Sequence, residues 1–267
     1  MGEILIREGR VIDPQAGLDE VTNLLIRDGQ IAEIGAGAQT ADTIIEAKGR
    51  IVAPGLVDTH VQLREPGFEE DETIESGSSA ALAGGFTSIA CLPNTDPPID
   101  TPAGVEFVRQ KASRARQAII HVIGCISKNR EGQQLAEIGT LVDAGAVAFS
   151  DAPTSLASAD LMRRALQYCL MFDKPIFSHA EVPELSQQGI MHEGVTSLLL
   201  GLDGMPSDAE DVMTSRDLRL AESTGGRVHL MNISSGESVE LVRRAKARGT
   251  RVTAGVCAAH FSLTDEN

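Results

Sequence analysis

The feature that most constrains the fold is a regular alternation, after residue 50, between short apolar segments and longer amphipathic ones. Seven apolar segments typical of buried strands lie at 51–57, 87–93, 119–126, 146–150, 175–178, 227–233 and 251–257. Helix signals separate them: Thr101 and Pro102 open one helix, Gly84 closes another, and Ser158 caps a third at 159–172. This order predicts right-handed βαβ units and a parallel sheet, either open or closed into a barrel.

Polar residues near the ends of the apolar segments help to separate these two architectures. They are His60, Asn94, Asp151, His179 and Asn232. An open doubly wound sheet concentrates its site at one switch point, whereas a (β/α)₈ barrel collects residues from many strands in one mouth. The distribution of these polar residues over the ends of several strands favours the barrel. Because a barrel needs eight strands and the seventh lies close to residue 267, we expect the closing strand to be missing from this sequence.

The first fifty residues have a different pattern, with short alternating strands. Asp28 and Gly29 stand between two apolar runs, which is a strong hairpin signal. A segment of this length is too small to bury a core alone. We therefore expect two domains, a partial β-sandwich at 1–52 and an α/β barrel domain at 53–267.

Composition limits the classes of partner. The 267 residues carry a formal charge of −15, which argues against nucleic acid or an anionic membrane as a partner. The four cysteines have no C-x-x-C spacing and are interpreted as reduced core residues. Neither a signal sequence nor an apolar run of membrane-spanning length is present, so we expect a cytoplasmic protein.

The stretch at 58–67, Asp-Thr-His-Val-Gln-Leu-Arg-Glu-Pro-Gly, follows the first strand of the predicted barrel. Alternation along an extended chain places His60, Gln62 and Arg64 on one face. The stretch resembles the opening motif of the class I dihydroorotases, Asp-x-His-x-His-Leu-Arg-Glu-Pro-Gly. Gln62 departs from it, because the family has its second histidine there.

The resemblance continues through essentially the whole chain and implies a TIM-type barrel of the metal-dependent hydrolase class beside a small β-sandwich. It implies that His60, Asp151 and His179 are zinc ligands. A second ligand histidine of the family is replaced by Asn232. Amide oxygens are poor zinc ligands beside imidazole, so we expect one ion, weak binding or no metal. The family's catalytic aspartate would lie beyond the chain end, so no residue here is assigned that role.

Simpler interpretations stand beside these. Arg64 and Asn94 match the residues that bind the substrate carboxylate in the family, but Arg64 could instead pair with Glu65 as a core arginine. Asp151 could cap the turn before Pro153. Three further histidines match no ligand position and are interpreted as hydrogen-bonded polar residues: His121, His192 and His229.

The first hypothesis is a metal-dependent cyclic amidohydrolase that interconverts dihydroorotate and N-carbamoyl-aspartate in pyrimidine biosynthesis, in an assembly of several copies. The alternative is a non-catalytic dihydroorotase homologue that acts as a structural partner of aspartate transcarbamoylase. A metal-free binding module for a small carboxylate is a third reading. Hydantoinases and allantoinases are disfavoured, because they place a carbamylated lysine on the fourth strand and no lysine lies between Lys128 and Lys174.

Overall fold

The computed structural model describes residues 2–35, 37, 40–186 and 189–264. The chain divides into two compact units, Met1–Leu56 and Val57–Asn267. This division does not test whether 1–52 and 53–267 each fold as a domain, so the expectation of two domains stays a prediction.

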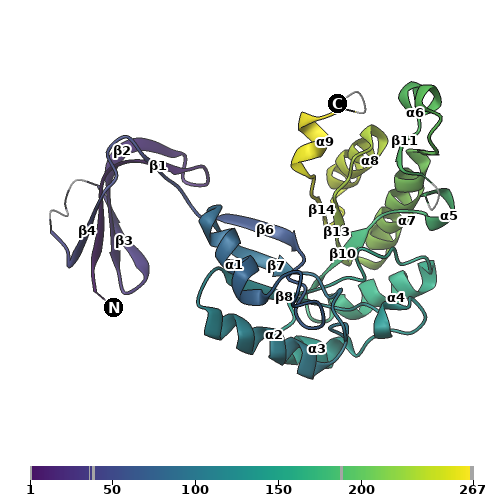
Figure 1. Ribbon diagram of the computed structural model, residues 1–267, viewed down its shortest axis with the longest axis horizontal. Helices are drawn as coiled ribbons and strands as arrows, with labels where there is room; N and C mark the ends of the chain where they lie inside the picture. Colours follow the sequence, from purple (N-terminus) through teal and green to yellow (C-terminus); the bar gives the residue numbers. More distant parts are fainter. Residues whose placement is uncertain (1, 36, 38–39, 187–188, 265–267) are drawn as a thin grey trace. The chain divides into compact units, whose positions relative to one another are not determined.

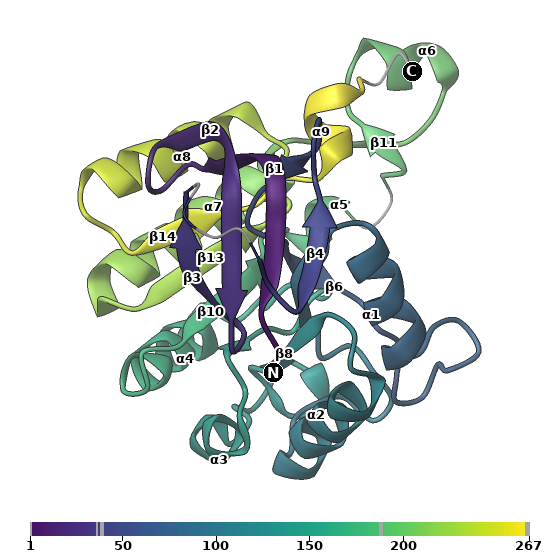
Figure 2. The same cartoon turned by 90° about the vertical axis from the view of Figure 1, so that its left-hand side faces the viewer.

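The first unit is built around one five-stranded sheet. Its strands are β1 (Ile4–Asp13), β2 (Leu18–Arg27), β3 (Gln30–Ile34), β4 (Thr43–Glu46) and β5 (Ile51–Val52). Four of them follow the order β3-β2-β1-β4, and β5 pairs with β1 (Figure 2). Arg27 pairs with Gln30 across the expected two-residue turn, in which Asp28 and Gly29 both have positive φ (52° and 77°). This is the hairpin turn that a strand's right-handed twist favours.

The second unit contains a seven-stranded sheet in the order β14-β13-β10-β9-β8-β7-β6. Its strands are β6 (Leu56–Val61), β7 (Phe86–Cys91), β8 (Ile119–Gly124), β9 (Ala148–Phe149), β10 (Pro175–His179), β13 (Arg227–Met231) and β14 (Val252–Ala254). The strand pairs with recorded registers are parallel, and the strands follow an arc from β6 to β14 (Figure 1). Six of the seven predicted strands are therefore confirmed, while the first is shifted: residues 51–52 form β5 in the first unit, and the barrel strand β6 begins at Leu56 and includes His60. The strands have the sequential order of a (β/α) barrel that is open between β6 and β14.

Helices connect the strands. They are α1 (Ile74–Ala83), α2 (Pro102–Ala115), α3 (Ile138–Ala144), α4 (Ala159–Leu170), α5 (Pro183–Ser186), α6 (Val195–Leu200), α7 (Asp208–Thr224), α8 (Gly236–Ala247) and α9 (Ala258–Ser262), with a 3₁₀ turn at Lys128–Arg130. The predicted caps are confirmed: Thr101 accepts from Gly104 N, Ser158 accepts from Leu161 N, and Gly84 ends α1. Helix α4 ends two residues earlier than expected.

Alternate residues of the strands pack on opposite faces of the sheet. On one face Ile89, Val122 and Leu230 join the main core with residues from the helices. On the other, Ala90 and Ile123 belong to a smaller cluster, which we call the inner cluster; its members are Ala90, Leu92, Ile123, Ala148, Ala152 and Met231, with Val147 and Phe177 packed against them. The helices therefore cover the outer face, as in a barrel.

One excursion was not predicted. Between β10 and α7 the chain forms α5, α6 and a small parallel pair, β11 (Met191–His192) and β12 (Gly204–Met205). These strands are two residues long, which is too short for a period-two pattern to show in the sequence. Within the described residues, no helix combines the length and apolarity needed to cross a membrane.

Candidate functional site

The five polar residues singled out in the sequence lie at the carboxyl ends of their strands. His60 is near the end of β6, His179 ends β10, and Asn232 directly follows β13. Asn94 and Asp151 lie just beyond β7 and β9. This is the edge at which parallel α/β proteins carry their chemistry, because the strand-to-helix loops meet there.

His60 and Asn232 are joined across the open sheet. The Asn232 Nδ2 atom lies 2.6 Å from His60 Nδ1, although 172 residues separate them. β6 is at one end of the strand order and β13 is next to the other end. Such a contact requires a curved sheet, so this hydrogen bond is direct evidence of barrel-like curvature.

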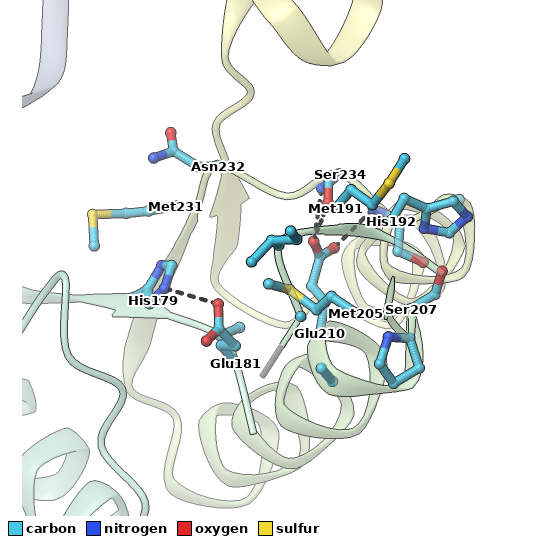
Figure 3. Close-up of a pocket in the computed structure, with 17 residues that line it drawn as sticks. His179, Glu181, Met191, His192, Met205, Ser207, Glu210, Met231, Asn232 and Ser234 are labelled. Atoms are coloured by element: carbon cyan, nitrogen blue, oxygen red, sulfur yellow. Dashed lines mark hydrogen bonds and ion pairs between the residues drawn. The ribbon is translucent and has the colours of Figure 1, made fainter. Parts of the chain in front are cut away.

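A left-handed backbone directs Asn232 toward His60. By alternation from Met231, a strand residue at position 232 would face the outer helices. Asn232 instead has φ of 52°, a conformation that asparagine tolerates better than most residues. The chain turns there, and the amide returns to the inner side. In Figure 3 it points away from Glu210.

His229 also lies on the inner side. Strand alternation counted back from Asn232 would place His229 on the opposite face, but the left-handed turn at Asn232 makes that count invalid. The His229 ring lies 4.6 Å from the ring of Phe177, and its Nδ1 is 2.8 Å from Thr253 Oγ1. Burial and the nearby charge of His60 lower the pKa of His229. Counting the alternation from Met231 would have placed His229 on the inner face.

Gln62, the other altered position, bonds to Asn94. Asn94 Nδ2 donates to Gln62 Oε1 over 3.1 Å. The amide oxygen that would replace an imidazole nitrogen is therefore already engaged in linking the ends of β6 and β7. Both altered ligand positions thus form amide hydrogen bonds with retained site residues.

Asp151 forms a buried hydrogen-bond network. Its side chain accepts from Ile126 N (2.9 Å), Ser127 N (3.1 Å) and Ser127 Oγ (2.5 Å). Only 3% of the residue is exposed, and burial raises the pKa of the Asp151 carboxyl against the opposing effect of these donors. The side chain does not cap the turn before Pro153; it fixes the loop after β8 to the end of β9.

His179 belongs to the wall of a cavity of about 710 Å³. Its Nε2 lies 3.4 Å from Glu181 Oε2 (Figure 3). Across the cavity, Glu210 accepts from the backbone N–H groups of Ser234 and Ser235 just before α8. The cavity is lined by polar and apolar residues of β10, β13 and the excursion.

Arg64 does not pair with Glu65, the partner that the simpler interpretation assigned to it. Glu65 pairs with Lys111 Nζ at 2.5 Å and accepts from Ile74 N. In the part of the chain that the structure describes, Arg64 forms no ion pair. Its φ of 59° marks the turn that leaves β6. A half-buried, unpaired guanidinium is suited to an anionic ligand.

The three proposed zinc ligands do not form a metal-binding group. Among the described residues, no three His, Cys, Asp or Glu side chains are arranged to hold a metal ion. The Asp151 carboxylate is occupied by donors, and His60 Nδ1 faces an amide nitrogen. A catalytic zinc needs three protein ligands and an open position. The donor set described here does not fit that requirement, and ligation by His60, Asp151 and His179 stays a prediction.

The fold and the strand-end cluster define a protein of the open (β/α)-barrel class. L-hydantoinase from Arthrobacter aurescens superimposes with a TM-score of 0.83 at 24% identity, covering 100% of this chain and 60% of that one. A D-hydantoinase superimposes with a TM-score of 0.78 at 24% identity, with coverages of 98% and 59%. These similarities concern the fold, and they confirm the predicted architecture.

Sequence comparison identifies the family. A family model described as dihydro-orotase-like matches residues 49–238. The chain is 50% identical over 266 residues to a dihydroorotase of Pelotomaculum thermopropionicum, covering 99% of this chain and 62% of that protein. It is 46% identical over 265 residues to a putative dihydroorotase of Rhodopirellula baltica, with coverages of 97% and 57%. The chain belongs to the dihydroorotase-like family of the amidohydrolase superfamily, and it spans about three fifths of the length of these relatives.

Proposed function

We propose that this protein is a non-catalytic member of the dihydroorotase-like family that acts as a structural partner of aspartate transcarbamoylase. The observation that carries the proposal is the chemistry of the two altered ligand positions. Gln62 and Asn232 supply neutral amides where the family motif has imidazoles, and both amides bond to neighbouring site residues. A site with these donors binds zinc poorly, so a retained fold supports a structural role.

A specific observation favours a second candidate, the enzyme itself. Arg64 and Asn94 remain at the positions that hold the substrate carboxylate in the family, and relatives of 46–50% identity are named dihydroorotases. In this case the protein would hydrolyse dihydroorotate reversibly to N-carbamoyl-aspartate. Ligand groups outside the described residues would then have to complete the metal centre.

Metal content and turnover separate the two candidates. The full-length protein is purified without chelator, its zinc is measured by elemental analysis, and ring opening of dihydroorotate is followed by absorbance. The proposal predicts substoichiometric zinc, no turnover, and co-elution with purified aspartate transcarbamoylase in gel filtration. Stoichiometric zinc with turnover that a chelator abolishes would establish the enzyme and overturn the proposal.

A double substitution provides the matched variant. Gln62→His with Asn232→His restores both imidazoles, and asparagine and histidine both tolerate the left-handed backbone at position 232. We expect the variant to bind more zinc than the native protein. Asn129→His is the control, because Asn129 is also left-handed (φ 52°) but has an exposed side chain. A gain equal to that of the control would contradict the placement of these two positions at a former metal site.

A further inference from the structure

Helix α6 has the reverse of the usual orientation of a surface helix. Its apolar side chains face solvent: Val195, Leu198 and Leu199 are 75%, 81% and 80% exposed. They stand at the i, i+3 and i+4 spacing that places side chains on one stripe of a helix. The polar Ser197 is buried instead, and its hydroxyl donates to Gly194 O. A helix in contact with water normally buries its apolar stripe, so this one is suited to contact with another surface.

The stripe is the centre of a larger apolar surface, which we call the excursion patch; its members are Ile190, Val195, Leu198, Leu199, Leu200 and Leu202. Ile190 lies next to the end of this segment, because its backbone N–H donates to Asp203 O. Both views place α6 at the outer end of the excursion, away from the sheet (Figure 1, Figure 2). The six side chains expose roughly 600 Å², which is at the upper end of what monomeric proteins leave uncovered.

Backbone hydrogen bonds close the excursion and hold the patch in place. β11 pairs with β12, and Glu193 N donates to Met205 O. Leu202 N donates to Ser197 O across the end of α6. A Cβ at Gly204 would lie 2.6 Å from the Cα of Glu193, so this close approach requires glycine. The leucines are therefore presented on a preformed surface, which lowers the entropy cost of association.

Charge indicates what covers the patch. Residues 194–202 carry no charged side chain, although 23% of the chain is charged and its formal net charge is −15. Two copies of so acidic a chain repel each other, and they approach most easily through a surface without charge. An anionic lipid surface is repelled for the same reason, and α6 lacks the Lys and Arg residues of helices that lie on membranes. These observations favour a second copy of the chain.

We propose that the excursion patch is the contact surface between two copies of this chain, related by a two-fold axis that passes close to α6. In such a contact both copies use the same surface. A stable interface buries about 800 Å² on each partner, and the patch supplies most of this area as an apolar core. Ile190 also lines the cavity beside His179, so the contact lies next to the candidate site. This inference does not rest on the proposed function.

Leu198→Glu tests the contact in the full-length protein. Leu198 is exposed, so the substitution leaves the fold of one copy intact, but it places two carboxylates in the apolar centre of the dimer. We expect the native protein to sediment as a dimer in analytical ultracentrifugation, and Leu198→Glu to weaken the dimer by about 100-fold or more. Met171→Glu is the matched control, because Met171 is 74% exposed at the end of α4, outside the patch. It should sediment like the native protein.

Hydrogen exchange of the native protein needs no variant. The backbone amides of α6 should exchange more slowly in a concentrated sample than in a dilute one, because the dimer covers them. The amides of α8 are the internal control and should exchange at the same rate in both samples. A native protein that is monomeric, exchange of α6 that does not depend on concentration, or equal dissociation of Leu198→Glu and Met171→Glu would each overturn the inference.

Other occupants of the patch give distinct results. Binding of the native protein to phosphatidylcholine vesicles, if Leu198→Glu abolishes it, would assign the patch to a lipid surface and overturn the inference. Co-elution of a monomeric native protein with aspartate transcarbamoylase, if Leu198→Glu abolishes it, would also overturn the inference but leave the proposed function standing. A dimer through the patch that does not co-elute with transcarbamoylase would overturn the proposed function and leave this inference standing.

Discussion

Replacing Asp151 tests whether this carboxylate is needed for the fold or only for metal. Its side chain satisfies two backbone N–H groups, of Ile126 and Ser127, and the Ser127 hydroxyl, all in a buried setting. Asp151→Ala leaves these donors without an acceptor. Each unsatisfied buried donor costs about 1 to 3 kcal/mol. Removing a carboxyl whose pKa is raised by burial offsets part of that cost.

The net loss expected for Asp151→Ala is about 3 to 5 kcal/mol, or roughly 6 to 20 °C in Tm for a domain of this size. Asp151→Asn keeps one oxygen as an acceptor, and its NH₂ group can donate to the Ser127 hydroxyl, so it should cost about 1 kcal/mol. Asp160→Ala is the control, because Asp160 lies on the exposed side of α4 and pairs with Arg164 on the surface.

Urea unfolding of the four proteins, followed by circular dichroism in EDTA, gives the free energies. The structural account requires the order native, Asp160→Ala, Asp151→Asn, Asp151→Ala, with the last clearly separated. Stability of Asp151→Ala within 1 kcal/mol of the native protein would refute the reasoning. Loss of bound zinc by Asp151→Ala in a separate measurement without chelator would support the prediction that Asp151 is a ligand.

Two further predictions concern buried groups. Burial raises the pKa of the Cys91 and Cys169 thiols to about 12 from 9.0, so their contribution to stability is complete below pH 9 and is lost as the pH rises toward 12. Measurements of the free energy of unfolding at pH 8 and pH 10.5 check this, and in the native protein the half-buried Cys257 should react first with a thiol reagent. Arg216→Ala removes the 2.7 Å ion pair of the fully buried Asp217 carboxylate and should lower the free energy of unfolding in urea by about 3 to 5 kcal/mol. Arg216→Lys should be intermediate, and equal stability of the two variants would contradict a paired role for Arg216.

Local pattern was a sound guide wherever the chain follows regular periodicity. Six of the seven strands, the cap at Ser158 and the turn at Asp28 and Gly29 follow from nearest-neighbour chemistry, which does not depend on distant segments. Alternation also placed His60 on the inner face. The excursion with β11 and β12 escaped prediction because its strands are too short to show a period.

The geometry of the site was harder to predict from the sequence, since it depends on where strands end and how the chain turns. Alternation failed at Asn232, where a left-handed residue reverses the direction of the side chain. The simpler interpretation of Arg64 made it the partner of Glu65, but the structure supplies Lys111 from α2 in that place. Ligation of a metal by His60, Asp151 and His179 stays a prediction, since no group of three such side chains is arranged to hold an ion among the described residues.

The sequence by itself determined the class of fold, the family and the identity of the side chains at the strand ends, because periodicity and motif are properties of neighbouring residues. Only the tertiary structure decided what those side chains touch. The 2.6 Å contact between His60 and Asn232 depends on sheet curvature and on one backbone turn, across 172 residues of chain. Hydrogen bonds are sensitive to tenths of an ångström, and such distances are set by the packing of the whole unit.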